Sequence, residues 1–159
     1  MHPARNLQRP VDSPKGVRRM PKILLAEDNP ADVYLIRTAL DEHGVKVPLQ
    51  VAADGREVLQ ILYQQALLPE PQLKLIILDL NLPRHDGIEI LQRLNETKAL
   101  ADIPVVVLTS SDSPRDRIAA TELGVSRILR KPSNLEQFLS LGAIFKEILG
   151  EAKAESGTN

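Results

Sequence analysis

Five short stretches rich in apolar residues recur along the chain, and each is followed by apolar residues at helical spacing. The stretches lie at residues 23–26, 47–51, 75–78, 105–108 and 126–129. Short apolar runs bounded by turn residues are typical of strands buried on both faces of a parallel sheet. Strands that alternate with helices through short connections predict right-handed crossovers and a sheet covered by helices on both faces.

Capping residues mark where the first three helices are expected to begin. Asn29 and Pro30 fit the N-cap and the first turn of one helix, and Gly44 fits its end. Residues 54–57 (Asp-Gly-Arg-Glu) form a capping-box pattern that opens the second helix. The third helix is predicted to begin near Asp86.

The last two helices are predicted from the same kinds of pattern. The fourth begins at Pro114, with Ile118 and Leu123 facing inward. A second capping box at residues 133–136 opens the final helix, and Gly150 is expected to end it. Apolar residues at helical spacing predict one buried stripe on this helix: Phe138, Leu141, Phe145 and Ile148.

The pattern predicts one domain over residues 21–150, flanked by two segments of different composition. Residues 1–20 hold three prolines and five basic residues with little that could be buried, which predicts a flexible basic extension. A docking arm for an acidic partner and an idle, solvated tail are both open interpretations, and the idle tail is the commoner case. Residues 151–159 are expected to form a small polar tail.

Composition narrows the possible partners and compartments. Twenty basic residues against 21 acidic ones leave a net charge of −1, which gives no drive toward nucleic acid or membrane. The absence of cysteine excludes disulfides and thiolate metal sites. No apolar run reaches membrane-spanning length and the N-terminus has no apolar signal core, so we expect a cytoplasmic protein.

Polar side chains follow four of the five predicted strands. Glu27 and Asp28 come directly after the first strand, Asp79 after the third, Thr109 after the fourth and Lys131 after the fifth. Ligands of open α/β sheets bind beyond the carboxyl ends of the strands. We therefore expect these five residues to meet at one rim of the sheet.

The chemistry of this rim points to a metal and a phosphoryl group. Three clustered carboxylates repel one another, and a hard divalent ion such as Mg²⁺ relieves that repulsion. Lys131 is suited to a phosphate oxygen, and Thr109 can donate a hydrogen bond to another. Together they are the parts for in-line phosphoryl transfer to Asp79, which would give an aspartyl phosphate.

These motifs resemble the response-regulator receiver domain of two-component systems, the CheY-like family. The resemblance covers about residues 21–149 and rests on residues 24–29 (LLAEDN), 78–83 (LDLNLP), 108–110 (LTS) and 131–132 (KP). It implies a flavodoxin-like (βα)5 three-layer sandwich with a five-stranded parallel sheet in the order 2-1-3-4-5. It also implies that Mg²⁺ is bound by Asp28, Asp79, the main-chain carbonyl of Asn81 and, through a water, Glu27.

The resemblance further implies how such a protein acts. Asp79 would accept a phosphoryl group from a histidine kinase, while Thr109 and Lys131 hold the phosphoryl oxygens. Residues 27–32 and 108–111 resemble the stand-alone regulators that partner phytochrome-type histidine kinases. The family commonly forms homodimers through its fourth helix, fifth strand and fifth helix, and we expect the same here. A phosphorelay intermediate would fit equally well.

The chain departs from the family pattern clearly at Ile128 and mildly at Glu27, where many receivers carry Asp, and three alternative functions remain. Ile128 stands where the family usually has an aromatic residue that relays phosphorylation to the surface, so an interaction module that no longer switches stays open. A phosphatase with a strand-end aspartate would need a carboxylic acid where Asn81 stands. A nucleotide-binding domain would need a glycine-rich loop after the first strand. We therefore expect no enzyme, and we interpret His85 as a solvated loop residue.

Overall fold

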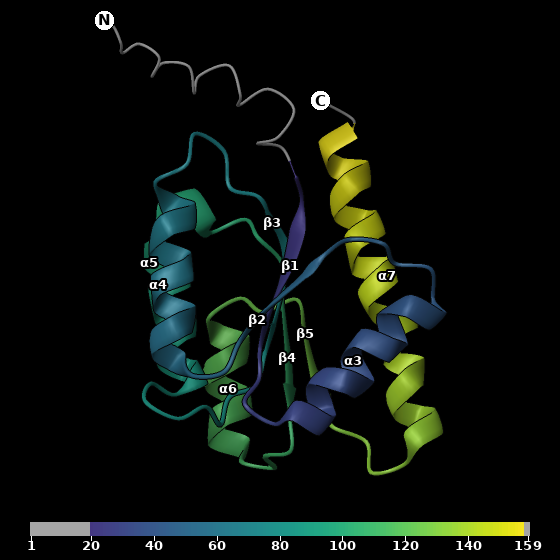
Figure 1. The fold of residues 1–159 in the computed structure, drawn as a ribbon. Coiled ribbons are helices and arrows are strands. Elements are labelled where there is room, and N and C mark those ends of the chain that lie inside the picture. The colour runs from purple at the N-terminus through teal and green to yellow at the C-terminus, as the bar shows by residue number, and fades with distance from the viewer. Residues whose placement is uncertain (1–19, 158–159) are drawn as a thin grey trace, which may run out of the picture.

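The computed structural model describes residues 20–157. In this part of the chain the strands form one parallel sheet. The strands run in the order β2-β1-β3-β4-β5, as the family resemblance implied (Figure 1). All four strand pairs are parallel. The strands are β1 (Lys22–Ala26), β2 (Leu49–Ala52), β3 (Leu73–Leu78), β4 (Val105–Thr109) and β5 (Arg127–Arg130).

Helices cover both faces of the sheet and complete the expected three-layer sandwich. α3 and α7 pack on one face, and α4, α5 and α6 pack on the other (Figure 1). These helices are α3 (Pro30–Glu42), α4 (Gly55–Ala66), α5 (Gly87–Glu96), α6 (Pro114–Glu122) and α7 (Leu135–Gly157), with a short 3-10 helix, η2 (Lys98–Leu100), before β4. No helix among residues 20–157 combines the length and the apolar content needed to cross a membrane.

Alternating residues of the inner strands pack into two separate cores, which explains why these strands are mostly apolar. Leu24 and Ile76 face the α4–α5–α6 side, whereas Ile23 and Ile77 face the α3–α7 side. The predicted stripe on α7 is confirmed, because its four members are at most 7% exposed: Phe138, Leu141, Phe145 and Ile148. Burial on both faces therefore fixes the strands whose carboxyl ends carry the predicted polar residues.

Three of the predicted helix starts are confirmed by their caps. The Asn29 side chain accepts a hydrogen bond from the Ala31 N–H at 2.9 Å, with Pro30 in the first turn. Asp54 accepts from the Glu57 N–H at 2.9 Å. Asp86 caps α5 in the same way, which fixes where the chain leaves the loop after β3.

Two predictions about α7 are wrong. Asn134, one residue after the predicted Ser133, caps the helix by accepting from the Gln137 N–H at 3.0 Å. Gly150 does not end the helix, which continues to Gly157 through most of the predicted polar tail. A single interior glycine costs only about 1 kcal/mol relative to alanine, and the strong helix formers on both sides of Gly150 outweigh that cost.

Ile118 is also misplaced by the sequence pattern. It was expected to face inward, but it is 60% exposed, whereas Ala120 is fully buried. Residues two apart on a helix lie on nearly opposite sides, so the burial of Ala120 turns Ile118 outward. Leu123, three positions after Ala120, packs against the core as predicted.

Candidate functional site

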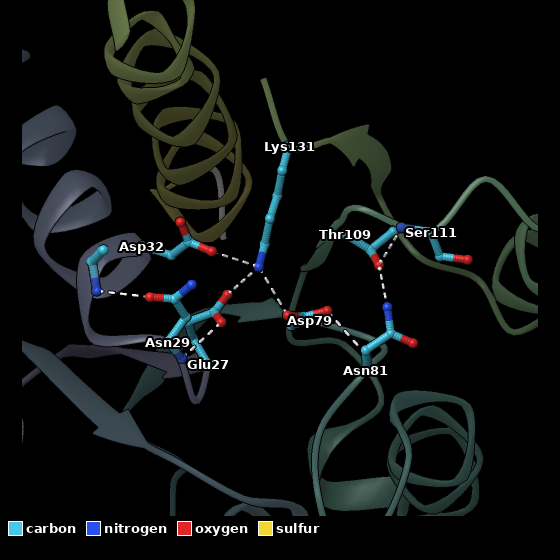
Figure 2. Close-up of polar contacts among 9 residues, drawn as sticks. Glu27, Asn29, Asp32, Asp79, Asn81, Thr109, Ser111 and Lys131 are labelled. Carbon is cyan, nitrogen blue, oxygen red and sulfur yellow. Dashed lines mark hydrogen bonds and ion pairs between the residues drawn. The ribbon is translucent and has the colours of Figure 1, made fainter. Parts of the chain in front are cut away.

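The predicted polar residues meet at the carboxyl-terminal rim of the sheet. Glu27 and Asp79 follow the last residues of β1 and β3, Thr109 ends β4, and Lys131 follows β5 (Figure 2). Glu27, Asp79 and Thr109 are 2%, 5% and 4% exposed. Three polar groups are thus buried at one place, where their mutual contacts must replace water.

Lys131 lies at the centre of this site. Its Nζ is 2.8 Å from Glu27 Oε1, 2.8 Å from Asp32 Oδ2 and 2.9 Å from Asp79 Oδ2. An ammonium group has three N–H donors, so each donor has one carboxylate acceptor. The lysine therefore joins β1, α3 and β3 to the end of β5.

Asp32 is the member of this group that the site prediction did not include. It lies in the first turn of α3, where an acidic residue ordinarily complements the helix dipole. The sequence does indicate that α3 begins at the same rim, directly after Glu27 and Asp28, and position 32 lies in the 27–32 segment that resembles the stand-alone regulators. The contact depends on how far a lysine side chain reaches from β5, which strand and helix patterns do not encode.

Burial and charge act against each other at this site. Burial lowers the pKa of Lys131, but the hydrogen bonds to Asp32, Glu27 and Asp79 outweigh it and hold that pKa above its ordinary value. Burial raises the pKa of Glu27, and the hydrogen bonds from Lys131 and the Asn29 N–H offset it only in part. The lysine therefore stays charged, whereas burial disfavours the charged form of Glu27.

Asp79 is fixed from two sides. Its Oδ1 accepts a hydrogen bond from the Asn81 N–H at 3.0 Å, and its Oδ2 accepts from Lys131. Its own N–H donates to the Ala26 carbonyl at 3.0 Å, which extends the pairing of β1 and β3 by one residue. The carboxylate is therefore held by backbone and side-chain donors at the open end of the central strand.

Thr109 lies beyond Asp79, on the side away from Asp32 (Figure 2). Its Oγ1 accepts a hydrogen bond from the Ser111 N–H at 3.1 Å, and the Asn81 side-chain amide lies 3.5 Å away. The Thr109 carbonyl accepts from the Lys131 N–H at 2.9 Å. These contacts bring the ends of β4 and β5 to the same side of the site.

Three carboxylates at the rim fit a divalent cation. Oxygens of Glu27, Asp28 and Asp79 all lie within 4.8 Å of one another, and Asp28 is exposed. Carboxylate oxygens without histidine or cysteine suit hard ions such as Mg²⁺ and Mn²⁺. The donor set therefore fits the predicted metal, while the carbonyl of Asn81 as a further ligand stays a prediction.

The loop between β3 and α5 is held against the start of α4. Arg84 has a φ of 79° and its Nε lies 3.3 Å from Asp54 Oδ2. His85, expected to be a solvated loop residue, is half-buried and its Nδ1 lies 3.0 Å from Glu89 Oε1. His85 thus contacts α5 and is not one of the three partners of Lys131.

Comparison with known proteins identifies the family. The sequence-family model for the response regulator receiver domain matches residues 23–141 of the chain. The chain belongs to this family, and the predicted CheY-like, two-component identity is confirmed.

Individual relatives agree with the predicted subgroup. Response regulator Rcp1 of Synechocystis sp. is 39% identical over 120 residues, 75% of this chain and 82% of Rcp1. The crystal structure of the phosphorylated cyanobacterial phytochrome response regulator RcpA is 36% identical, with a TM-score of 0.72 over 81% of this chain and 93% of that one. The Mn²⁺-bound form of Rcp1 is 37% identical, with a TM-score of 0.66 over 82% of this chain and 91% of that one. The chain spans 47–58% of the length of several further curated relatives.

Proposed function

We propose that this receiver accepts a phosphoryl group on Asp79 from a histidine kinase, in a reaction that depends on a divalent cation. The observation that carries the proposal is the setting of Asp79. This carboxylate is 5% exposed, 2.9 Å from the Lys131 ammonium and clustered with the oxygens of Glu27 and Asp28. A structural carboxylate at a strand end needs a partner, but it does not need a lysine and two further acids.

The proposed reaction forms one bond and breaks one. An oxygen of Asp79 attacks phosphorus while the P–N bond of the donor phosphohistidine breaks, and the electron pair stays on the imidazole nitrogen, which takes up a proton. A divalent cation held by Glu27, Asp28 and Asp79 would neutralise charge on a phosphoryl oxygen. Lys131 and the Thr109 hydroxyl donate hydrogen bonds to the other two oxygens.

The proposed metal ligands are of two kinds, those that bind the cation directly and one that acts through a water. Asp28 and Asp79 bind the cation directly, as does the main-chain carbonyl of Asn81. Glu27 acts through a bound water, because its carboxylate is already engaged by Lys131 and by the Asn29 N–H at 3.1 Å. Mg²⁺ is the proposed ion, and the Mn²⁺-bound structure of Rcp1 supports a divalent cation in a relative.

The proposed partners are a phytochrome-type histidine kinase and a second copy of this chain. Similarity to Rcp1 and to the phytochrome response regulator RcpA supports the kinase class, and phosphoryl transfer from such a kinase would take place in the cytoplasm. The homodimer would use α6, β5 and α7, where Ile118 and Leu135 are 60% and 61% exposed. Acting as a phosphorelay intermediate is the alternative output, and neither output requires enzymatic turnover.

Intact-mass spectrometry tests the proposal. The wild type is incubated with acetyl phosphate and Mg²⁺ beside Asp79→Asn and a control, Asp102→Asn, which removes an exposed acid before β4. We expect one added phosphoryl group in the wild type and the control, dependent on Mg²⁺ and lost in Asp79→Asn. An unmodified wild type that also fails to bind beryllofluoride would contradict the proposal and favour a receiver-like interaction module.

A further inference from the structure

Asp32 makes a contact that the proposed reaction does not explain. Its Oδ2 lies 2.8 Å from Lys131 Nζ, as close as the nearest oxygen of Glu27 and closer than that of Asp79. Its side chain is 18% exposed, so water screens the contact only in part. Asp32 is not one of the three acids that cluster for a cation. Its side chain is therefore directed at the lysine, which is its one side-chain partner among residues 20–157.

Figure 2 shows Lys131 Nζ between Asp32, which comes from α3, and Asp79, which comes from the end of β3. The lysine stem is four flexible carbons long and begins at the end of β5, so contacts at its tip favour the rotamers that place its ammonium group beside Asp79. Two of the three acceptors, Glu27 and Asp79, are also groups that would face a bound cation.

Metal binding and phosphorylation would therefore change two of the three contacts of Lys131. A divalent cation repels the ammonium and competes with it for the oxygens of Glu27 and Asp79. The contact with Asp32 lies outside this competition. It is thus the contact that can keep Nζ beside Asp79 while the cation is bound and the phosphoryl donor arrives.

We infer that Asp32 is a positioning residue that holds Lys131 in place for phosphoryl transfer to Asp79. The inference rests on the proposed function and adds the residue through which α3 takes part in it. It predicts that Asp32 acts on the reaction only through Lys131. It also predicts that Asp32 contributes nothing to metal affinity as a ligand.

A double-mutant cycle tests the inference. Phosphorylation rates with acetyl phosphate at saturating Mg²⁺ are measured for the wild type, Asp32→Ala, Lys131→Met and the double variant, and beryllofluoride affinity is measured by fluorine NMR. We expect Asp32→Ala to lower both by about tenfold, the usual scale for losing a group that orients a functional side chain. In the Lys131→Met background the same change should have no further effect.

Two more variants separate positioning from a structural role. Asp32→Asn keeps the side-chain shape and a hydrogen-bond acceptor but loses the charge. Its phosphorylation rate and beryllofluoride affinity should therefore lie between those of the wild type and Asp32→Ala. Asp41→Asn removes an exposed charge from the same helix and should match the wild type. Magnesium affinity should not fall in Asp32→Ala.

The outcomes distinguish this inference from the proposed function. A wild type that takes up neither phosphoryl group nor beryllofluoride overturns the proposed function and the inference together. A wild type that works, with Asp32→Ala equally fast or faster, overturns the inference alone. An equal loss in both lysine backgrounds also overturns it, because Asp32 would then act through the fold and not through Lys131.

Discussion

Replacing Lys131 with methionine should destabilise the protein in a way that depends on pH. Methionine keeps much of the apolar stem but removes the ammonium that lies 2.8–2.9 Å from three carboxylates. Each contact amounts to about 6 kcal/mol of attraction at an effective dielectric constant of about 20. Desolvation of the ammonium and repulsion among the carboxylates offset most of this attraction. The expected loss of stability is therefore taken from the measured cost of removing one partner of a buried ion pair, which leaves the other partner buried without a counter-charge.

The expected loss is about 3 kcal/mol of unfolding free energy at pH 7, at the lower end of the range for breaking a buried pair. The lower end applies because the Lys131 side chain keeps 12% exposure, whereas Glu27 keeps 2%. Urea denaturation of wild type and variant measures the difference. Lys46→Met is the matched control, since Lys46 is exposed, and it should change stability by no more than about 0.5 kcal/mol.

The pH dependence of the unfolding free energy tests whether Glu27 is the carboxylate that destabilises the Lys131→Met variant. The pKa of Glu27 is already raised by burial in the wild type, and Lys131 opposes that rise. A raised acid pKa means that this group favours folding at low pH and loses that contribution as pH rises through the folded pKa. Lys131→Met should raise the Glu27 pKa further, so the cost of the variant should shrink between pH 7 and pH 5. The pKa of Lys131 lies above its ordinary value, so Lys131 stays protonated between pH 5 and pH 7. Its titration therefore does not change the unfolding free energy over this pH range.

Two results would show that Lys131 does not stabilise the buried carboxylates in this way. One is a Lys131→Met variant whose unfolding free energy at pH 7 matches that of the Lys46→Met control. The other is a loss of the expected size that does not decrease as the pH is lowered from 7, because an unpaired buried glutamate must become less costly once it is protonated.

Three further predictions concern the metal, the packing of α7 and self-association. Asp28→Asn should weaken Mg²⁺ binding in calorimetric titration, and an unchanged affinity would remove Asp28 as a ligand. Gly142→Ala should cost about 1–3 kcal/mol because a Cβ there would overlap the Ala39 carbonyl oxygen, whereas Gly150→Ala meets open space and should gain up to about 1 kcal/mol in the same denaturation assay. Beryllofluoride should strengthen self-association in sedimentation experiments, and Ile118→Ser should weaken it; a monomer in both states at high concentration would contradict the proposed dimer.

The sheet and most of the site could be predicted because they follow from strand ends. Apolar runs with polar residues directly after them fix which side chains reach the rim, so Glu27, Asp79, Thr109 and Lys131 are placed correctly. The missing member, Asp32, depends on a side-chain contact between β5 and α3 that local patterns do not record.

The errors on the helices have a related cause. Gly150 ends no helix because neighbouring propensities outweigh one glycine, and Ile118 is exposed because the small Ala120 faces the core instead. Asn134 takes the cap from Ser133 because both are good capping residues and the local pattern does not choose between them. Tertiary packing therefore decides which side of α6 faces the core, whereas the two errors on α7 come from local preferences that are close in strength.

Locating the phosphoryl group on the chain is the decisive test of phosphorylation at Asp79. After reaction with acetyl phosphate and Mg²⁺, borohydride reduction converts an aspartyl phosphate to homoserine, and peptide mass spectrometry then identifies the position. Homoserine is expected at position 79 and at no other position, with none formed when Mg²⁺ is chelated. Homoserine at Asp28 or Asp32 with an unmodified Asp79 would contradict phosphoryl transfer to Asp79.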